Sequence, residues 1–132
     1  MRLIIHQPGD ETFTYEIPGY GTLHWNVTHA QRAVAAGQVE AHVTVDREQL
    51  AAIAAKNEWT QARVDQADPT IPGIGAPVIW QGQIIYILID GTHRAVRAHQ
   101  TGVPFEADLL TEAASRACLI AGVPGLIPGG FR

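Results

Sequence analysis

The longest apolar run of the chain predicts a buried strand. Residues 84–89 contain no polar position and are rich in β-branched side chains. Such a run is typical of a strand that is covered on both faces of its sheet. Residues 78–80 are apolar as well, and Gln81, Gly82 and Gln83 provide a turn between the two segments. We therefore expect a β-hairpin whose second strand is buried on both faces.

Alternation between apolar and polar positions predicts another strand. Apolar side chains stand at every second position from residue 39 to residue 45, the period of a strand with one buried face. Asp46 follows as a helix N-cap, with Gln49 at the capping-box position three residues later. In the predicted helix, Leu50, Ile53 and Ala54 face the core.

The first forty residues give a less regular pattern. Residues 3–6 and 12–17 are expected to form a hairpin around residues 8–10, followed by a loop over residues 18–21. Thr28 is the predicted N-cap of a helix, because Gln31 stands at capping-box spacing. That helix should run to Ala36 and end at Gly37.

The remaining segments complete an α+β pattern. Residues 66–76 are rich in Pro and Gly and predict a loop, and residues 105–110 predict a strand. Thr111 is the expected cap of a last helix over residues 112–121, which would bury Cys118. Residues 123–132 have Pro or Gly at half of their positions, so this tail is either poorly ordered or docked on a partner. The predicted fold is a small mixed sheet with helices packed on it.

Composition limits the classes of protein that fit. The chain has 132 residues, 46% hydrophobic and 17% charged, as expected of one compact domain. No apolar run approaches the roughly 20 residues of a membrane-spanning helix, so no membrane association is expected. A single cysteine excludes an internal disulfide and suits a cytoplasmic protein. With nine basic and thirteen acidic residues, any contact with DNA would not use a broad basic surface.

The residues that follow the long apolar run carry the main functional signal. Asp90 ends the run, Gly91 permits a sharp exit, and Thr92 is the expected N-cap of a helix. A helix N-terminus next to an arginine, here Arg94, attracts phosphate through its free N–H groups, its dipole and the guanidinium charge. His93 lies between Thr92 and Arg94 in the first turn of this predicted helix.

Helical periodicity places a second arginine beside the first. With successive residues about 100° apart, Arg97 falls on the same exposed face as His93 and Arg94. His99 falls on the opposite, inner face, where it is expected to be a hydrogen-bonded packing residue.

The segment from Asp90 to Ala98, followed by Gly102 and a further strand, resembles the signature of the ParB/sulfiredoxin superfamily. There a strand ends in a Gly-x-x-Arg or Gly-x-His-Arg turn, and the start of the next helix holds nucleotide phosphates. The resemblance is close over residues 77–111 and compatible over residues 43–57. It implies one ParB-like domain with a motif core at about 39–122, an N-terminal hairpin extension at 1–38 and a tail at 123–132.

The residues of this turn also indicate which branches of the superfamily the chain resembles. Sulfiredoxins have a catalytic cysteine before the His-Arg pair, where this chain has Thr92, so sulfinic-acid reduction is not expected. ParB partition proteins bind CTP and continue into a helix-turn-helix domain, which we do not expect in this chain. Other relatives are ATP-dependent kinases with an Asp-Gly-His-His-Arg turn, or ATPases and nucleases, and Asp90 matches the aspartate of the kinases.

Two functions follow from the resemblance. The first is a nucleotide-dependent hydrolase or phosphotransferase, in which Gly91, Thr92, His93, Arg94 and Arg97 bind the phosphates of ATP or CTP. Asp90 and His93 would be its catalytic residues, and Asp90 would hold Mg²⁺. The second is a non-catalytic module in which nucleotide binding changes assembly, with a homodimer or another protein as partner, as in a partition protein, a regulator or an antitoxin.

Overall fold

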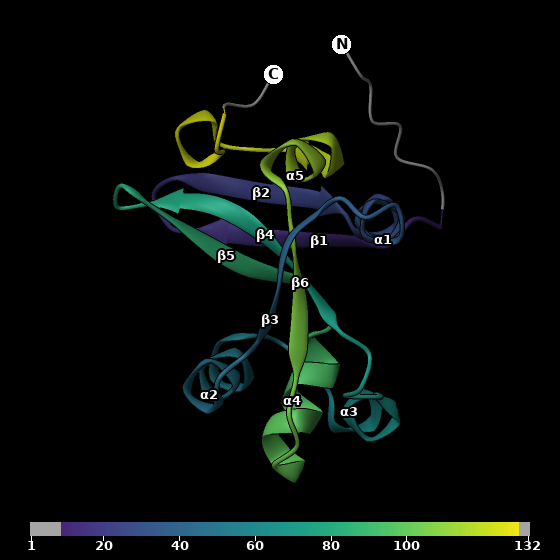
Figure 1. Ribbon diagram of the computed structural model, residues 1–132. Coiled ribbons are helices and arrows are strands. Elements are labelled where there is room, and N and C mark those ends of the chain that lie inside the picture. The colour runs from purple at the N-terminus through teal and green to yellow at the C-terminus, as the bar shows by residue number, and fades with distance from the viewer. Residues whose placement is uncertain (1–8, 130–132) are drawn as a thin grey trace.

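The structure is a computed structural model that describes residues 9–129 (Figure 1). Its elements, in chain order, are β1 (Thr12–Ile17), β2 (Gly21–Asn26), α1 (Val27–Ala35), β3 (Val39–Thr44), α2 (Arg47–Lys56), α3 (Gln61–Gln66), β4 (Gly73–Trp80), β5 (Gln83–Asp90), α4 (Thr92–Thr101), β6 (Glu106–Leu110), α5 (Glu112–Cys118), β7 (Leu119–Ala121) and the 3₁₀ turn η1 (Pro124–Leu126).

The strands form two sheets. A three-stranded antiparallel sheet has the order β1-β2-β7, and a four-stranded sheet has the order β3-β6-β4-β5. In the larger sheet β4 and β6 are parallel, because the chain crosses over through α4 between β5 and β6. The expected α+β class, with helices packed on a mixed sheet, is confirmed, and the structure adds the second sheet.

Two hydrophobic clusters hold these elements together. The larger cluster lies between the two sheets and includes Trp25, Val78 and Leu110, together with residues of α1 and α5. The smaller one joins α2 to α4 through Leu50, Ala95, Ala98 and Phe105. In Figure 1, α2, α3 and α4 lie below β1, β2, β4 and β5, and β3 and β6 run down toward these helices.

Several local predictions are confirmed. β3 alternates between half-buried and exposed side chains, and Asp46 and Gln49 form the predicted capping box of α2. Thr111 caps α5 by accepting a hydrogen bond from the Ala114 N–H, and Cys118 is buried. The hairpin of β4 and β5 turns at Gln81 and Gly82 as expected.

The N-terminal predictions need correction. β1 pairs with β2, a strand that was not predicted, and the expected loop over residues 18–21 leads into it. Residues 3–6, the expected partner of β1, lie outside the described part. The cap of α1 is Asn26, which accepts from the His29 N–H. Thr28 was predicted for that role, but its hydroxyl accepts from the Glu11 N–H instead.

Two further segments differ from their predictions. The expected loop over residues 66–76 already enters β4 at Gly73, and the short helix α3 precedes it. The part of the tail that the structure describes is docked on the chain's own core, because Leu126 and Ile127 belong to the larger cluster. Arg116 adds a hydrogen bond to the Pro128 carbonyl.

The largest correction concerns β5. This strand lies at the edge of its sheet, and Ile84, Ile85 and Tyr86 are 51%, 41% and 40% exposed. The prediction of burial on both faces is therefore wrong for the first half of the strand. The apolar run indicates a strand but not its neighbours, because the same sequence pattern suits a central strand and an uncovered edge.

Candidate functional site

The predicted strand–turn–helix is present, with Gly91 at its centre. Gly91 has φ +101° and is the N-cap of α4, so Thr92 is the first helical residue and not the predicted cap. A β-carbon at position 91 would lie 3.0 Å from Arg94 Nη2 and 3.1 Å from the Gly73 Cα. Both the backbone angle and the close approach of these neighbours therefore favour glycine.

The N-terminus of α4 has no side-chain cap. Asn26, Asp46 and Thr111 cap α1, α2 and α5, whereas Gly91 has no side chain that could accept from the first turn of α4. First-turn N–H groups have no partner inside their own helix. Those of Thr92, His93 and Arg94 are therefore available to an anion.

Asp90 and Arg94 form an ion pair across the turn. Arg94 Nη2 lies 3.2 Å from Asp90 Oδ2, and the two side chains are 17% and 13% exposed. Gln31 of α1 donates from Nε2 to the same Asp90 oxygen at 3.2 Å and to Glu11 Oε2 at 3.4 Å. Arg94 is thus mostly buried and held by a carboxylate, which corrects the expectation of an exposed guanidinium.

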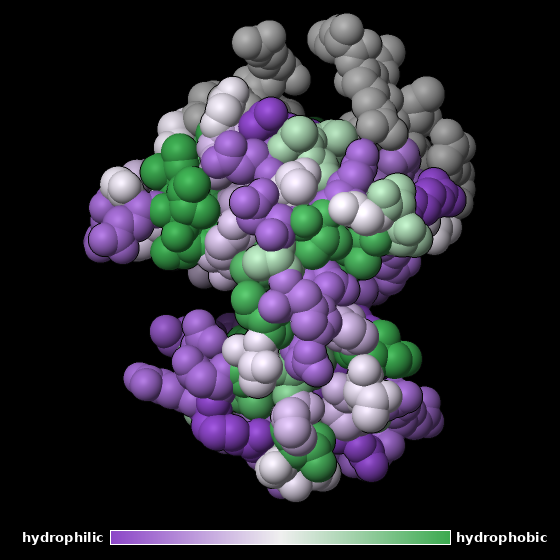
Figure 2. All heavy atoms as spheres, in the orientation of Figure 1, coloured by the Kyte–Doolittle hydropathy of each residue, from purple (hydrophilic) through white to green (hydrophobic). Residues whose placement is uncertain are grey.

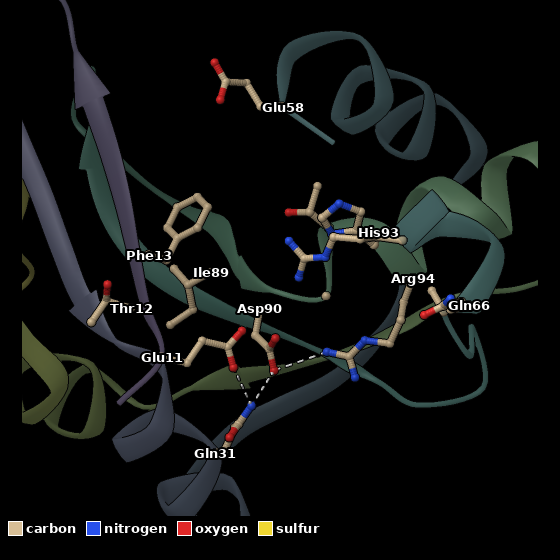
Figure 3. A pocket seen from close by; sticks show the side chains of 14 residues that line it. Glu11, Thr12, Phe13, Gln31, Glu58, Gln66, Ile89, Asp90, His93 and Arg94 are labelled. Carbon is tan, nitrogen blue, oxygen red and sulfur yellow. Dashed lines mark hydrogen bonds and ion pairs between the residues drawn. The ribbon is translucent and has the colours of Figure 1, made fainter. Parts of the chain in front are cut away.

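A cavity of about 520 Å³ opens at this turn (Figure 3). Five predicted site residues line it, namely Asp90, Gly91, Thr92, His93 and Arg94. The other lining residues are Glu11, Thr12, Phe13, Gln31, Glu58, Arg63, Gln66, Ala67 and Ile89. In Figure 3 the Asp90–Arg94 pair and Gln31 lie on one side of the pocket, and Glu58 lies on the other.

Arg97, the sixth predicted residue, is engaged elsewhere. Its Nη1 donates to the carbonyl oxygens of Val64 and Asp65 at the end of α3, and it does not line the cavity. The expected exposed face shared with Arg94 is therefore wrong. His99 is exposed, not on the inner face, and its carbonyl accepts from Arg47.

The surroundings of His93 favour its neutral imidazole by lowering its pKa. Burial lowers the pKa of His93 below its ordinary value of 6.5, and the positive charge of Arg63 lowers it further. The Thr60 N–H donates to Nε2 at 3.4 Å, so in this arrangement Nδ1 carries the ring proton. In its neutral form His93 can therefore donate a hydrogen bond from Nδ1.

Sequence reasoning missed the residues that border the pocket from outside the motif. Arg63 belongs to α3, a helix of six residues with one buried side chain, which is too short to show a periodic signal. Glu11 and Gln31 reach the site because β1 and α1 pack beside the end of β5. Their contribution depends on tertiary packing, which no local pattern in the sequence indicates.

Glu11 and Asp90 are two neighbouring carboxylates of the pocket that could hold Mg²⁺ together with phosphate oxygens. Within residues 9–129 no group of three or more His, Cys, Asp or Glu side chains could hold a metal ion. Glu11 and Asp90 lie close together, because both accept from the same Gln31 nitrogen. One or two carboxylates with phosphate oxygens are the usual ligands of Mg²⁺ in nucleotide sites.

Comparison with known proteins leaves the resemblance as a prediction. No protein-family model, curated protein or solved structure matches the chain. Among the described helices, none is both long and apolar enough to span a membrane.

Proposed function

We propose that the chain binds a nucleotide, ATP or CTP, or a similar phosphorylated molecule in the α4 pocket and hydrolyses its terminal phosphate. One observation carries the proposal: the uncapped N-terminus of α4, Arg63 and Arg94 border the same cavity. Helix N-terminal N–H groups and guanidinium groups both favour phosphate. The ParB-like motif supports the same position for the phosphates.

The residues that line the pocket would each contribute a different contact to the phosphates. The N–H groups of Thr92 and His93 would donate to phosphate oxygens, and His93 Nδ1 would add a further donor. Arg63 is exposed on α3 and can approach the outer phosphate without leaving a partner in the core. Arg94, with Nη2 held by Asp90, would contribute mainly positive charge.

Hydrolysis also needs an acceptor for a proton. Water would attack the terminal phosphorus while the bond to the leaving phosphate breaks, and a carboxylate would take the proton of the water. Glu11 is suited to this step because it is exposed at the pocket, whereas Asp90 is engaged with Arg94. Mg²⁺ held by Asp90 and phosphate oxygens would neutralise charge on the phosphates and would leave Glu11 as the proton acceptor.

A specific contact favours a second, non-catalytic function. Gln31 of α1 bonds to the carboxylate that holds Arg94 of α4. A phosphate that draws Arg94 away from Asp90 would change the hydrogen bond between Gln31 of α1 and Asp90, and so the contact between α1 and α4. The pocket would then act as a nucleotide-dependent switch of assembly.

Calorimetric titration with ATP, CTP and GTP, with and without Mg²⁺, tests both functions when a phosphate-release assay runs beside it. Binding with release supports the hydrolase, and binding without release supports the switch. If none of the three nucleotides binds, the proposal is wrong.

A further inference from the structure

The position of β5 at an exposed edge of its sheet conflicts with its apolar, uncharged sequence. From Pro69 to Ile89 the chain has no charged residue, and β5 is apolar from Ile84 to Ile89. Proteins usually protect an open edge with charged side chains, proline or a bulge. The other long edge strands follow this rule, since β1 contains Glu16 and β3 contains Glu40 and His42.

Two apolar grooves flank β5, one on each face of its sheet. A groove of about 510 Å³ lies between Leu88 and Tyr86 of β5, Leu109 of β6 and Ile53 of α2. Figure 2 shows the molecule hollowed between the sheets and α2, where this groove lies.

The second groove, of about 380 Å³, lies beside β1. Ile85 and Ile87 line it together with Tyr15, Ile17 and Trp80. Successive side chains of a strand point to opposite faces. A strand added to the edge of β5 would therefore set its alternate side chains beside the β5 residues that border the two grooves, which is the pattern of recognition by strand addition.

We infer that the β5 edge pairs with β5 of a second copy of this chain, antiparallel and around a twofold axis. The added strand must be apolar on both faces, and β5 itself meets this requirement along its exposed half. Such pairing gives β5 the central position that its sequence pattern indicates. It also closes the dimer, because each copy covers the edge of the other and no open edge of β5 is left.

Charge supports a second copy as the occupant. The net charge of −4 makes copies repel one another, and acidic residues on the β1 and β3 edges add to this repulsion. Residues 83–89 of β5 carry no charged side chain, so no charge on this part of the strand opposes the approach of a second copy. This inference is independent of the proposed nucleotide site.

The test compares two lysine substitutions in the full chain. Ile84→Lys puts a charge on the β5 edge, and Ile71→Lys puts the same charge on the loop before β4. The two isoleucines are matched, since Ile84 is 51% exposed and Ile71 is 50% exposed. Circular dichroism and thermal unfolding would show that both variants keep the fold.

Sedimentation velocity over a range of protein concentrations measures the dimer. We expect a reversible dimer for the wild type, a dissociation constant at least about tenfold higher for Ile84→Lys, and no change for Ile71→Lys. Hydrogen exchange of residues 83–89 should slow with rising concentration in the wild type and not in Ile84→Lys. A wild type that stays monomeric overturns the inference and leaves the edge to a strand of another protein. A dimer that resists Ile84→Lys, or that both lysines weaken equally, overturns it as well.

Discussion

Arg94 Nη2 lies 3.2 Å from Asp90 Oδ2, so the arginine and the aspartate of the motif are bound to each other across the first turn of α4. Both side chains are mostly buried. The residues that sequence reasoning assigned to a ligand therefore also contribute to the fold. Effects of their substitution on stability and on binding must be measured separately.

Replacing Arg94 should reduce stability as well as binding. Arg94→Ala leaves the Asp90 carboxylate without its ion-pair partner, at a cost of about 1 to 3 kcal/mol, between exposed and fully buried pairs. Urea denaturation measures this loss as a lower midpoint. The double variant Asp90→Asn with Arg94→Ala should recover part of it, because the unpaired charge is then removed. An unchanged midpoint for Arg94→Ala would contradict the structural role of the pair.

Arg63 offers a cleaner test of the phosphate site. Arg63 is exposed at the pocket, so Arg63→Gln should weaken nucleotide binding by about tenfold or more, the effect of one charge-assisted hydrogen bond. The unfolding midpoint should stay the same. Arg32→Gln is the matched control, because Arg32 is equally an exposed helical arginine but does not line the pocket. Equal affinities for both variants and the wild type would remove Arg63 from the site.

Local patterns sufficed for much of the fold. The capping box of Asp46 and Gln49, the alternation along β3 and the turn between β4 and β5 are signals that depend on a few neighbouring residues. The strand–glycine–helix pattern at Gly91 also depends on a few neighbouring residues. Five of the six site residues predicted from it line one pocket.

Features that depend on packing could not be predicted in this way. The edge position of β5 is set by which strands pair, and Arg97 turns toward α3 because that short helix packs on α4. A helical projection finds the polar face on which Arg97 lies, but not the element that covers this face. The same reason explains why Arg63 and Glu11 were missed at the pocket.

Gly91 should tolerate no side chain. Gly91→Ala places a β-carbon 3.0 Å from Arg94 Nη2 at φ +101°, and strained backbone of this kind costs about 1 to 3 kcal/mol. Gly37→Ala is the control, since Gly37 has φ +80° but no atom within 4 Å of an added β-carbon. The difference between their unfolding free energies, from urea denaturation, isolates the effect of the crowded turn. Equal losses would mean that backbone strain alone explains the glycine.

His42 should make stability depend on pH. On the exposed surface of β3, its Nδ1 lies 2.6 Å from Asp108 Oδ1 and its Nε2 bonds to Glu106. The hydrogen bond to Asp108, followed by that to Glu106, raises the pKa of His42 above 6.5. A group with a higher pKa in the folded state holds its proton more tightly there, so protonation stabilises the fold. This contribution is complete below the unfolded pKa and is lost as the pH rises through the folded pKa.

His42→Gln should therefore lower the free energy of unfolding more at a pH of about 5.5 than at about 8.5. Urea denaturation at a series of pH values measures this difference, and an NMR titration of the imidazole gives the pKa of His42 directly. Asp108→Asn should bring that pKa back toward its ordinary value, because it replaces the carboxylate with the largest effect by a neutral amide. If the pKa of His42 does not move in Asp108→Asn, the cross-strand pair does not hold the proton, and the expected pH dependence fails with it.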